Sequence, residues 1–372
     1  MLIFALILLL CSTSAYVAQK SAGKSSLLFI VATMLAVMVP AGVAGLRGIH
    51  CGVDILVYCK PAFDDVSHYD TFWKYHEAEG MDLFFAALIY WTGKLSGDFS
   101  VALYNIALVV VSFFYIASYK SRREVPMWIT YSLLMIGYYA LSFNLMRQCM
   151  AIAFLMIGYT CLLRGNKFKN FILYLVISYF FHKTAVFGGS VLLFIHYAST
   201  LSMWKRIVLA VIFVASCVGV LIAFKMILST MALLGGRFES YEAYGGSGGA
   251  HFKSGFCTVL LVGDIMCMCL AVVCYYMKIL TAKEAYVYGL ICVASVMAES
   301  LGIYTYYATR IGMYFAATQA FYLPMIATSD KLTERTSFVA KVVVVLVFIA
   351  IWVRISGMMG GAVPYSSSIL DI

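Results

Sequence analysis

The sequence predicts an all-α, polytopic helical membrane protein with about twelve transmembrane helices. Of its 372 residues, 63% are hydrophobic and only 12% are charged, and the mean hydropathy is +0.94. A soluble globular protein is about a quarter charged and about half apolar, so this composition cannot supply a water-facing surface. Only 5 prolines and as many as 26 Phe and 27 Tyr also argue against a disordered chain.

The individual helices follow from apolar runs, because a membrane-spanning helix needs about 20 mostly apolar residues. The first run lacks the basic start of a signal peptide, which favours an uncleaved span. The predicted spans are 1–18, 25–45, 99–118, 125–142, 149–163, 170–185, 185–199, 207–224, 255–277, 285–303, 311–328 and 337–356. The whole chain, 1–372, is therefore expected to form a single integral membrane domain.

Two longer polar stretches separate these spans. Residues 46–98 are expected to form an outer loop, in which the short apolar segment 81–95 carries Trp91 and Lys94 and is therefore interpreted as interfacial or re-entrant. Residues 225–254 are expected to form a second outer loop, which is rich in glycine.

The orientation follows from the basic residues, which collect in short cytoplasmic loops. Alternate loops carry clusters such as Lys120, Arg122 and Arg123, whereas most acids lie on the opposite side. With twelve spans this pattern places both termini outside. The net charge of +9 is then explained by topology, so nucleic acid is not expected as a partner.

Two polar clusters in the first half of the chain stand out on the outer side. Arg47 to Asp54, followed by Tyr58, comes directly after the second span; the alternative is an ordinary loop with one snorkelling arginine. Between two later spans, Asn144, Arg147 and Gln148 are expected on one helix face at i, i+3 and i+4. A charge at membrane depth usually faces a cavity or a partner, which favours a functional role for Arg147.

Two further clusters follow. His182 and Lys183 join two spans without a spacer, and a tight hairpin reaching water explains them equally well. Arg310 heads a late span and is followed by Tyr314; an aromatic belt at the interface explains the nearby tyrosines but not the arginine.

Other patterns do not fit their usual structural context. The glycine-rich stretch 245–249 matches a nucleophile elbow in letters only, because that motif needs a strand and a helix around it. His68 and His76 lie near several aspartates, but their spacing matches no recurrent metal site, and solvated loop charges explain them better. No metal site and no cofactor are therefore predicted.

The outer clusters share cationic groups, which suggests an anionic ligand. The guanidinium groups of Arg47, Arg147 and Arg310 can hold phosphate oxygens bidentately, and Lys183 and His182 lie in the same region. The simplest such ligand at headgroup depth is the phosphate or diphosphate of a lipid. Three acids on the same side could accept a proton from a hydroxyl group: Asp54, Glu79 and Asp82.

In these motifs the sequence resembles the EpsG family, the Wzy-like polymerases of bacterial exopolysaccharide and O-antigen. The most specific part is Asn144-x-x-Arg147-Gln148-x-x-Ala151, followed after one further span by Phe181-His182-x-Thr184-Ala185. Three shorter elements agree in order and spacing, and together they extend the likeness over roughly 1–330: Arg47, Gly52, Asp54 and Tyr58; Glu79-Gly80; Arg310 and Tyr314.

The resemblance implies a GT-C-like glycosyltransferase of the bacterial inner membrane with an outward-facing cavity. It would join undecaprenyl-diphosphate-linked oligosaccharide units on the outer face, in the lipid bilayer and beside a flippase and a chain-length regulator. Charge neutralisation by the arginines suggests a metal-independent reaction.

The candidate residues divide into three roles. Asp54 is expected to activate the acceptor hydroxyl, with His182 next, while Arg147 stabilises the leaving diphosphate. The diphosphate contacts are expected from Arg47, Arg147, Gln148, Lys183 and Arg310, and the remaining substrate contacts from Asn144, Glu79, Tyr58 and Tyr314.

Three other functions remain open from the sequence. A transporter or flippase of the same lipid-linked sugar would also need arginines, although it would carry charge through both leaflets. The outer His182 also suits an O-antigen-ligase-like enzyme or an acyltransferase, and a structural scaffold is the remaining alternative.

Overall fold

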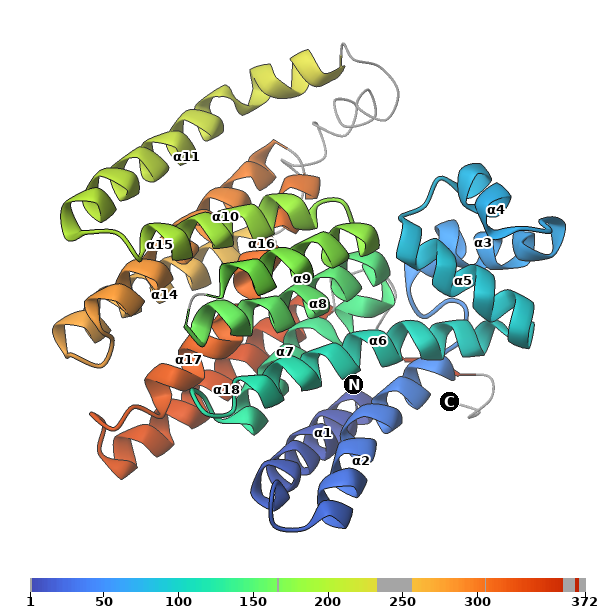
Figure 1. Ribbon diagram of the computed structural model, residues 1–372, viewed down its shortest axis with the longest axis horizontal. Coiled ribbons are helices and arrows are strands. Elements are labelled where there is room, and N and C mark those ends of the chain that lie inside the picture. The colour runs from blue at the N-terminus through green and yellow to red at the C-terminus, as the bar shows by residue number, and fades with distance from the viewer. Residues whose placement is uncertain (1, 166, 233–255, 305, 357–364, 368–372) are drawn as a thin grey trace. The chain divides into compact units, whose positions relative to one another are not determined.

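The computed structural model describes all residues except 1, 166, 233–255, 305, 357–364 and 368–372. The described residues form helices and turns, with no strand among them (Figure 1). They fold into two compact units, residues 1–186 with 341–372 and residues 187–340. Each unit is described by itself.

The first unit contains most of the long helices. Its elements are α1 (Leu2–Ser21), α2 (Ser26–Gly45), π-helix η1 (Ile55–Cys59), α3 (Lys60–Asp65), 3-10 helix η2 (Val66–His68), α4 (Phe72–Glu79), α5 (Leu83–Ser96), α6 (Phe99–Lys120), α7 (Met127–Tyr138), 3-10 helix η3 (Leu141–Phe143), α8 (Met146–Leu163) and α9 (Phe168–Phe181).

The second unit begins just after the start of α10 (Ala185–Ala198). It continues with α11 (Met203–Ala232), α14 (Phe256–Tyr276), α15 (Ala282–Ser300), 3-10 helix η5 (Leu301–Ile303), α16 (Tyr306–Ala316) and α17 (Gln319–Ala327). The last helix, α18 (Glu334–Ser356), starts in the second unit and continues in the first.

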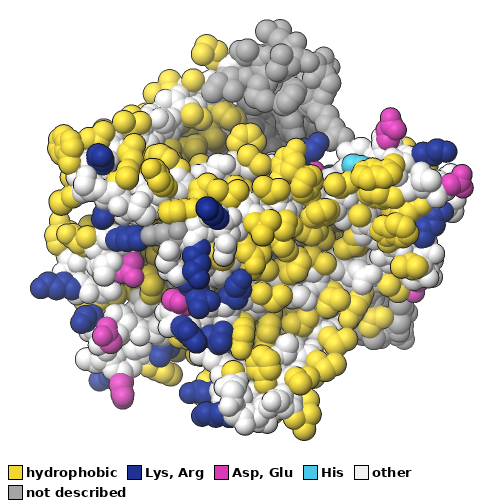
Figure 2. All heavy atoms as spheres, viewed as in Figure 1, with side chains coloured by type: hydrophobic (Ala, Val, Ile, Leu, Met, Phe, Trp, Pro, Cys, Tyr) yellow, Lys and Arg dark blue, Asp and Glu magenta, His cyan; other side chains and the backbone are white. Residues whose placement is uncertain are grey.

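Six helices in the described part of the chain are long and apolar enough to cross a membrane: α1, α2, α6, α8, residues 203–224 of α11 and residues 259–276 of α14. Apolar side chains such as Ile222 and Leu346 are exposed, and Figure 2 shows hydrophobic side chains over much of the face in view. The expectation of a polytopic, all-helical membrane protein agrees with these features.

Several predicted spans differ in length from the helices. The predicted span 311–328 is divided into α16 and α17, because the chain turns at Ala317 and Thr318, where the Thr318 hydroxyl donates to the Phe315 carbonyl at 2.7 Å. Helices α5, α7, α9 and α10 have only 12 to 14 residues, about 18–21 Å at 1.5 Å per residue. The number of twelve spans therefore stays a prediction.

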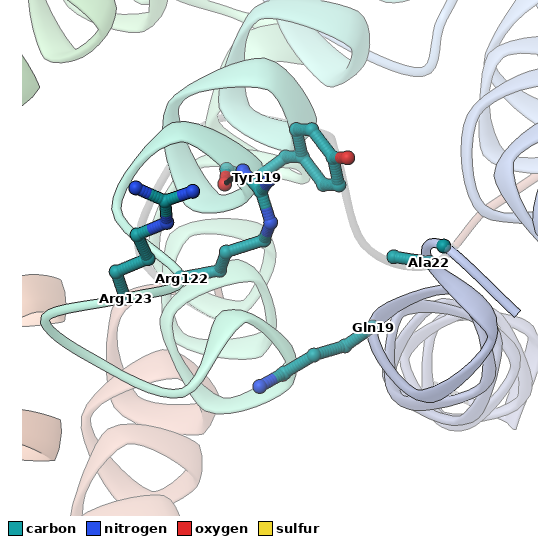
Figure 3. A pocket seen from close by; sticks show the side chains of 6 residues that line it. Gln19, Ala22, Tyr119, Arg122 and Arg123 are labelled. Carbon is teal, nitrogen blue, oxygen red and sulfur yellow. Dashed lines mark hydrogen bonds between the residues drawn. The ribbon is translucent and has the colours of Figure 1, made fainter.

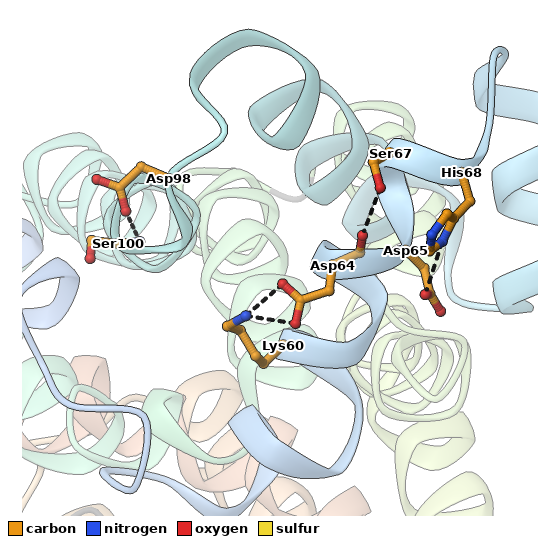
Figure 4. A network of polar contacts seen from close by, with 7 residues as sticks. All are labelled: Lys60, Asp64, Asp65, Ser67, His68, Asp98 and Ser100. Atoms are coloured by element: carbon orange, nitrogen blue, oxygen red, sulfur yellow. Dashed lines mark hydrogen bonds and ion pairs between the residues drawn. The ribbon is translucent and has the colours of Figure 1, made fainter.

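The two predicted outer loops also differ from simple loops. Residues 46–98 contain four short helices and α5, not an extended loop, and polar pairs tie their turns: Lys60 with Asp64 at 2.5 Å, Asp65 with His68 at 3.4 Å (Figure 4). In the second stretch, α11 continues to Ala232, past the expected start of the loop. The rest of it lies almost entirely outside the described residues.

Proline inside α2 links three helices of the first unit. Pro40 has no N–H to donate, so the Ala36 carbonyl one turn earlier lacks its helical partner. The Tyr131 hydroxyl of α7 donates to that carbonyl at 2.7 Å, and the Cys11 thiol of α1 lies 3.6 Å from it. In a membrane such a freed carbonyl needs a partner within the protein, and here the partner fixes α2 against its neighbours.

Helix α8 forms the core of the first unit. It packs against both α6 and α9, and of its 18 residues 83% are buried. Gly158 permits the close approach of α9, because a Cβ there would lie 2.6 Å from the Cβ of Tyr174. The first turn of this buried helix carries Arg147.

Candidate active site

A buried carboxylate joins two of the predicted motifs. Asp82 Oδ2 accepts a hydrogen bond from Arg147 Nη1 at 3.2 Å and lies 3.3 Å from His182 Nδ1. The three residues come from α5, α8 and the end of α9 (Figure 1). The Asp82 side chain is 7% exposed, whereas Arg147 and His182 are 27% and 20% exposed. A ligand can therefore reach Arg147 and His182 more readily than the carboxylate behind them.

Asp82 occupies the N-cap position of α5 without acting as a cap. An aspartate there normally accepts a hydrogen bond from a backbone N–H of the first turn, which is worth about 1 kcal/mol. No such bond is formed by the Asp82 side chain, which turns to Arg147 and His182 instead. We infer from the missing capping bond that the role of the carboxylate is to bind these two partners.

The pKa of Asp82 is governed by opposing effects. Burial acts to raise it, but the hydrogen bond with His182 and the charges of His182, Arg147 and Lys183 together hold it below the ordinary carboxyl value. Asp82 is therefore an anion at neutral pH. Lys183 is exposed and belongs to the same electrostatic environment.

Aromatic packing keeps α5 beside the end of α9. The Phe84 ring, two residues after Asp82, lies 5.2 Å from the ring of Phe180 and 5.3 Å from that of Phe181, measured between centroids. Both partners directly precede His182. This contact holds Asp82 and His182 within reach of each other across 100 residues of sequence.

Tyr58 packs against the Arg147 side chain. The Arg147 guanidinium lies over the Tyr58 ring, 4.6 Å from its centroid, and Tyr58 packs edge-on against Phe85. Tyr58 is part of the π-helix η1, an irregular element that is frequent at functional sites. Asp82, Arg147, His182 and Tyr58 are called the Asp82 cluster below.

Asp54 lies close to this cluster. Burial raises the pKa of Tyr58 well above its usual value, the charge of Asp54 raises it further, and Arg147 acts in the opposite direction. The electrostatic contribution of Asp54 places it near Tyr58. Asp54 is half-buried and directly precedes η1. Its role as the base that activates the acceptor hydroxyl stays a prediction.

The first predicted motif is packed onto the second. The Val53 N–H donates to Asn144 Oδ1 at 2.7 Å. Gly52 has φ +121°, and a Cβ there would lie 2.4 Å from the Phe143 carbonyl oxygen, so only glycine fits. The expectation that Asn144 shares a helix face with Arg147 and Gln148 is wrong, because α8 begins at Met146. Asn144 precedes the helix and anchors the loop of the first motif.

Arg47 is buried and makes contacts of its own. Its guanidinium lies 4.2 Å from the Phe143 ring centroid, and Nη1 donates to the Ala44 carbonyl at 2.7 Å. The residue is 4% exposed. Its Nε and Nη2 atoms have no hydrogen-bond partner in the part of the chain that the structure describes. A role in diphosphate binding stays a prediction for Arg47.

Two other candidates of the first unit lie in different surroundings. Gln148 is buried in α8 at 2% exposure. Glu79 ends α4, where burial and the nearby charge of Asp65 raise the pKa of its carboxyl group. The contacts described for these residues do not join them to the Asp82 cluster, and their substrate roles stay predictions.

Arg310 and Tyr314 belong to the second unit. Both lie on α16, and Tyr314 is fully buried against Gly188 of α10, where a Cβ would lie 2.6 Å from the tyrosine side chain. The expected meeting of Arg310 with Arg147 stays a prediction. Asp264, an intramembrane acid of this unit, accepts a hydrogen bond from the Ser295 hydroxyl at 2.6 Å.

The role of Asp82 as the common partner of Arg147 and His182 could not be predicted from spacing. The sequence shows an acid in the right region, but its two partners lie 65 and 100 residues away. Among the described residues, no group of three His, Cys, Asp or Glu side chains is arranged to hold a metal ion.

Comparison with known proteins identifies the family. No curated protein and no solved structure matches the chain. The model of the EpsG family matches residues 30–367, which include every residue of the Asp82 cluster. This family is associated with polysaccharide biosynthesis. The chain therefore belongs to the EpsG family.

Proposed function

We propose that the protein is a membrane glycosyltransferase that polymerises undecaprenyl-diphosphate-linked oligosaccharide units on the outer face of the bacterial inner membrane. Family membership supports the polymerase activity. The observation that carries the proposal is the Asp82 cluster, in which the partly exposed side chains of Arg147 and His182 share one buried carboxylate.

The reaction transfers a sugar chain from one lipid diphosphate to the end of another unit. A hydroxyl oxygen of the acceptor sugar bonds to the anomeric carbon of the donor, and the bond from that carbon to the diphosphate oxygen breaks. The hydroxyl proton passes to a base, and the lipid diphosphate leaves with the bonding electron pair. The donor is already activated, so the protein has to position two substrates and stabilise the leaving charge.

Arg147 is suited to hold the leaving diphosphate. A guanidinium carries five N–H donors, and the contact with Asp82 uses one of its nitrogens. The packing over Tyr58 fixes the plane of the fork while the side chain stays 27% exposed. A preorganised donor of this kind is worth about 2.7–4 kcal/mol in the oxyanion hole of a serine protease, where it also stabilises developing charge.

His182 is suited to accept the hydroxyl proton. Its Nδ1 faces the Asp82 carboxylate, so the neutral ring that donates this hydrogen bond carries its lone pair on Nε2. The carboxylate also stabilises the imidazolium that forms, as in a Ser-His-Asp triad. Asp82 is then a positioning residue, while Asp54, beside Tyr58, remains the alternative base.

The proposal is tested with purified protein in liposomes that contain a synthetic lipid-diphosphate repeat unit. Wild type is expected to produce a ladder of chains. Arg147→Ala should leave the single unit unreacted, with a rate loss of about 100-fold or more. The matched control is Arg164→Ala, which removes an arginine–carboxylate pair of the same 3.2 Å length, with Glu124, at the other end of α8.

A normal ladder from Arg147→Ala would remove this residue from the site. Movement of the lipid across the membrane by wild type without chain growth would favour the flippase alternative. A parallel reaction with a chelator tests the expected metal independence, because a ladder that disappears there would contradict it.

A further inference from the structure

A second polar site lies at the basic end of the first unit. The turn after α1 and the turn after α6 border an open cavity of about 490 Å³, lined by Gln19, Ala22, Gly23, Tyr119, Arg122 and Arg123 (Figure 3). This volume is within the range of about 300–1,000 Å³ that is usual for small-molecule sites. None of the residues in the proposed mechanism lines it.

The cavity carries two positive charges without a counter-ion. Neither Arg122 nor Arg123 forms an ion pair with a carboxylate of the described residues, and no acid is part of the lining. The neighbouring acid, Glu124, is paired with Arg164 at 3.2 Å. An anion is therefore the ligand that this lining favours.

Arg122 is fixed in its orientation. Its guanidinium lies over the Tyr119 ring at 3.8 Å from the centroid, and Nη1 donates to the Tyr119 carbonyl at 2.7 Å (Figure 3). These two contacts reduce the side-chain entropy lost on binding and leave further N–H donors on the guanidinium. The planar fork matches the oxygens of a phosphate group.

The position of the cavity points to a lipid headgroup. Both α1 and α6 are apolar enough to cross a membrane, and each has a lysine in its last turn, Lys20 and Lys120. The cavity therefore lies where these helices leave the hydrocarbon layer, and basic pockets between membrane helices bind anionic headgroups. We propose that it binds the phosphate of an anionic lipid headgroup.

The test measures lipid binding to the purified full-length protein by native mass spectrometry. The probes are phosphatidylglycerol, zwitterionic phosphatidylcholine and soluble glycerol 3-phosphate. The variant Arg122→Gln/Arg123→Gln should weaken phosphatidylglycerol binding about tenfold or more, as expected for charged hydrogen bonds. The matched control, Lys167→Gln/Lys169→Gln, removes two exposed charges outside the cavity and should bind as wild type does.

The remaining probes separate net charge and the source of the phosphate. Phosphatidylcholine has the phosphate but no net charge, so wild type should bind it more weakly than phosphatidylglycerol. If glycerol 3-phosphate binds with the same dependence on the arginines as the lipid, the phosphate site stands and its source is the free anion. Equal binding by the arginine variant and wild type in both arms, or an equal loss in the lysine control, overturns the proposal.

Discussion

At the scale of single residues, Asp82 shows how position can override local preference. At the start of α5 its carboxylate would stabilise the helix by capping, yet it contacts Arg147 and His182 instead. Its lowered pKa means that folding favours the charged form, so this stabilisation is present above the ordinary carboxyl pKa and is lost as the pH falls through the depressed value. Arg147 and His182 therefore keep an anionic partner at any physiological pH.

Gly52 allows a prediction about the loop that carries Asp54. Gly52→Ala should destabilise the protein by about 2 kcal/mol or more, because its φ of +121° is strained for alanine and the Cβ would clash with the Phe143 carbonyl at 2.4 Å. Thermal unfolding in detergent measures the loss. Polymer formation should fall as well, since the Val53–Asn144 contact follows directly.

Gly97 provides the control for this substitution. It also has a positive φ, +64°, but a Cβ there meets no atom within 4 Å. Gly97→Ala is therefore expected to cost only about 1 kcal/mol, the usual penalty of the left-handed region. Similar losses for the two variants would show that strain alone, and not the contact with Phe143, requires glycine at position 52.

At the scale of elements, hydropathy predicted the long helices well and the short ones poorly. The predicted runs 25–45 and 99–118 agree closely with α2 and α6. Helix α7, in contrast, ends at Tyr138 although the apolar run continues to 142, because hydropathy does not report where a helix gives way to the 3-10 turn at Leu141. That turn sets the position of Asn144.

The contact between α5 and α9 leads to a prediction at this scale. Phe84→Ala removes the ring that packs on Phe180 and Phe181, so Asp82 and His182 should separate and polymer formation should drop at least about tenfold. The ladder assay measures the activity. The stability cost is expected to be modest, about 1–3 kcal/mol, since Phe84 is only half-buried.

Phe29 of α2 is the matched control. Its side chain is half-buried and packs on Tyr119 of α6 with centroids 5.5 Å apart, at the opposite side of the predicted topology from the Asp82 cluster. Phe29→Ala should show a similar loss of stability with polymer formation retained. If both variants lose activity in proportion to stability, the aromatic contact of α5 has no particular role in the site.

At the scale of the whole molecule, the sequence predicted the class of protein and singled out three of the four residues in the Asp82 cluster. Composition required a membrane protein, and the motif residues Arg147, His182 and Tyr58 are in fact brought together. The contact that organises them could not be predicted, because it depends on how α5, α8 and α9 pack. The role of Arg310 depends in the same way on packing between distant parts of the chain, and it stays a prediction.

The orientation of the chain in the membrane supplies the last prediction. Lys169 lies in the first turn of α9 and Lys183 follows its last residue by two positions; the helix has 14 residues, about 21 Å. Lys169 comes directly after the basic turn with Arg164 and Lys167, and Lys183 neighbours the Asp82 cluster, so the positive-inside rule places the two lysines on opposite sides. A membrane-impermeant maleimide applied to intact cells should label Lys183→Cys above the wild-type background and should leave Lys169→Cys unlabelled until the cells are opened.

The outcome decides which substrate pool the site can use. The helix is shorter than the hydrocarbon layer of about 30 Å, so the Asp82 cluster at its end lies at or below the headgroup level, where the diphosphate of a lipid-linked sugar is located. Labelling of Lys183→Cys from outside would mean that the cluster meets units already flipped across the membrane. Labelling of Lys169→Cys alone would reverse the orientation, and the cluster would then face cytoplasmic units and could not extend a chain on the cell surface.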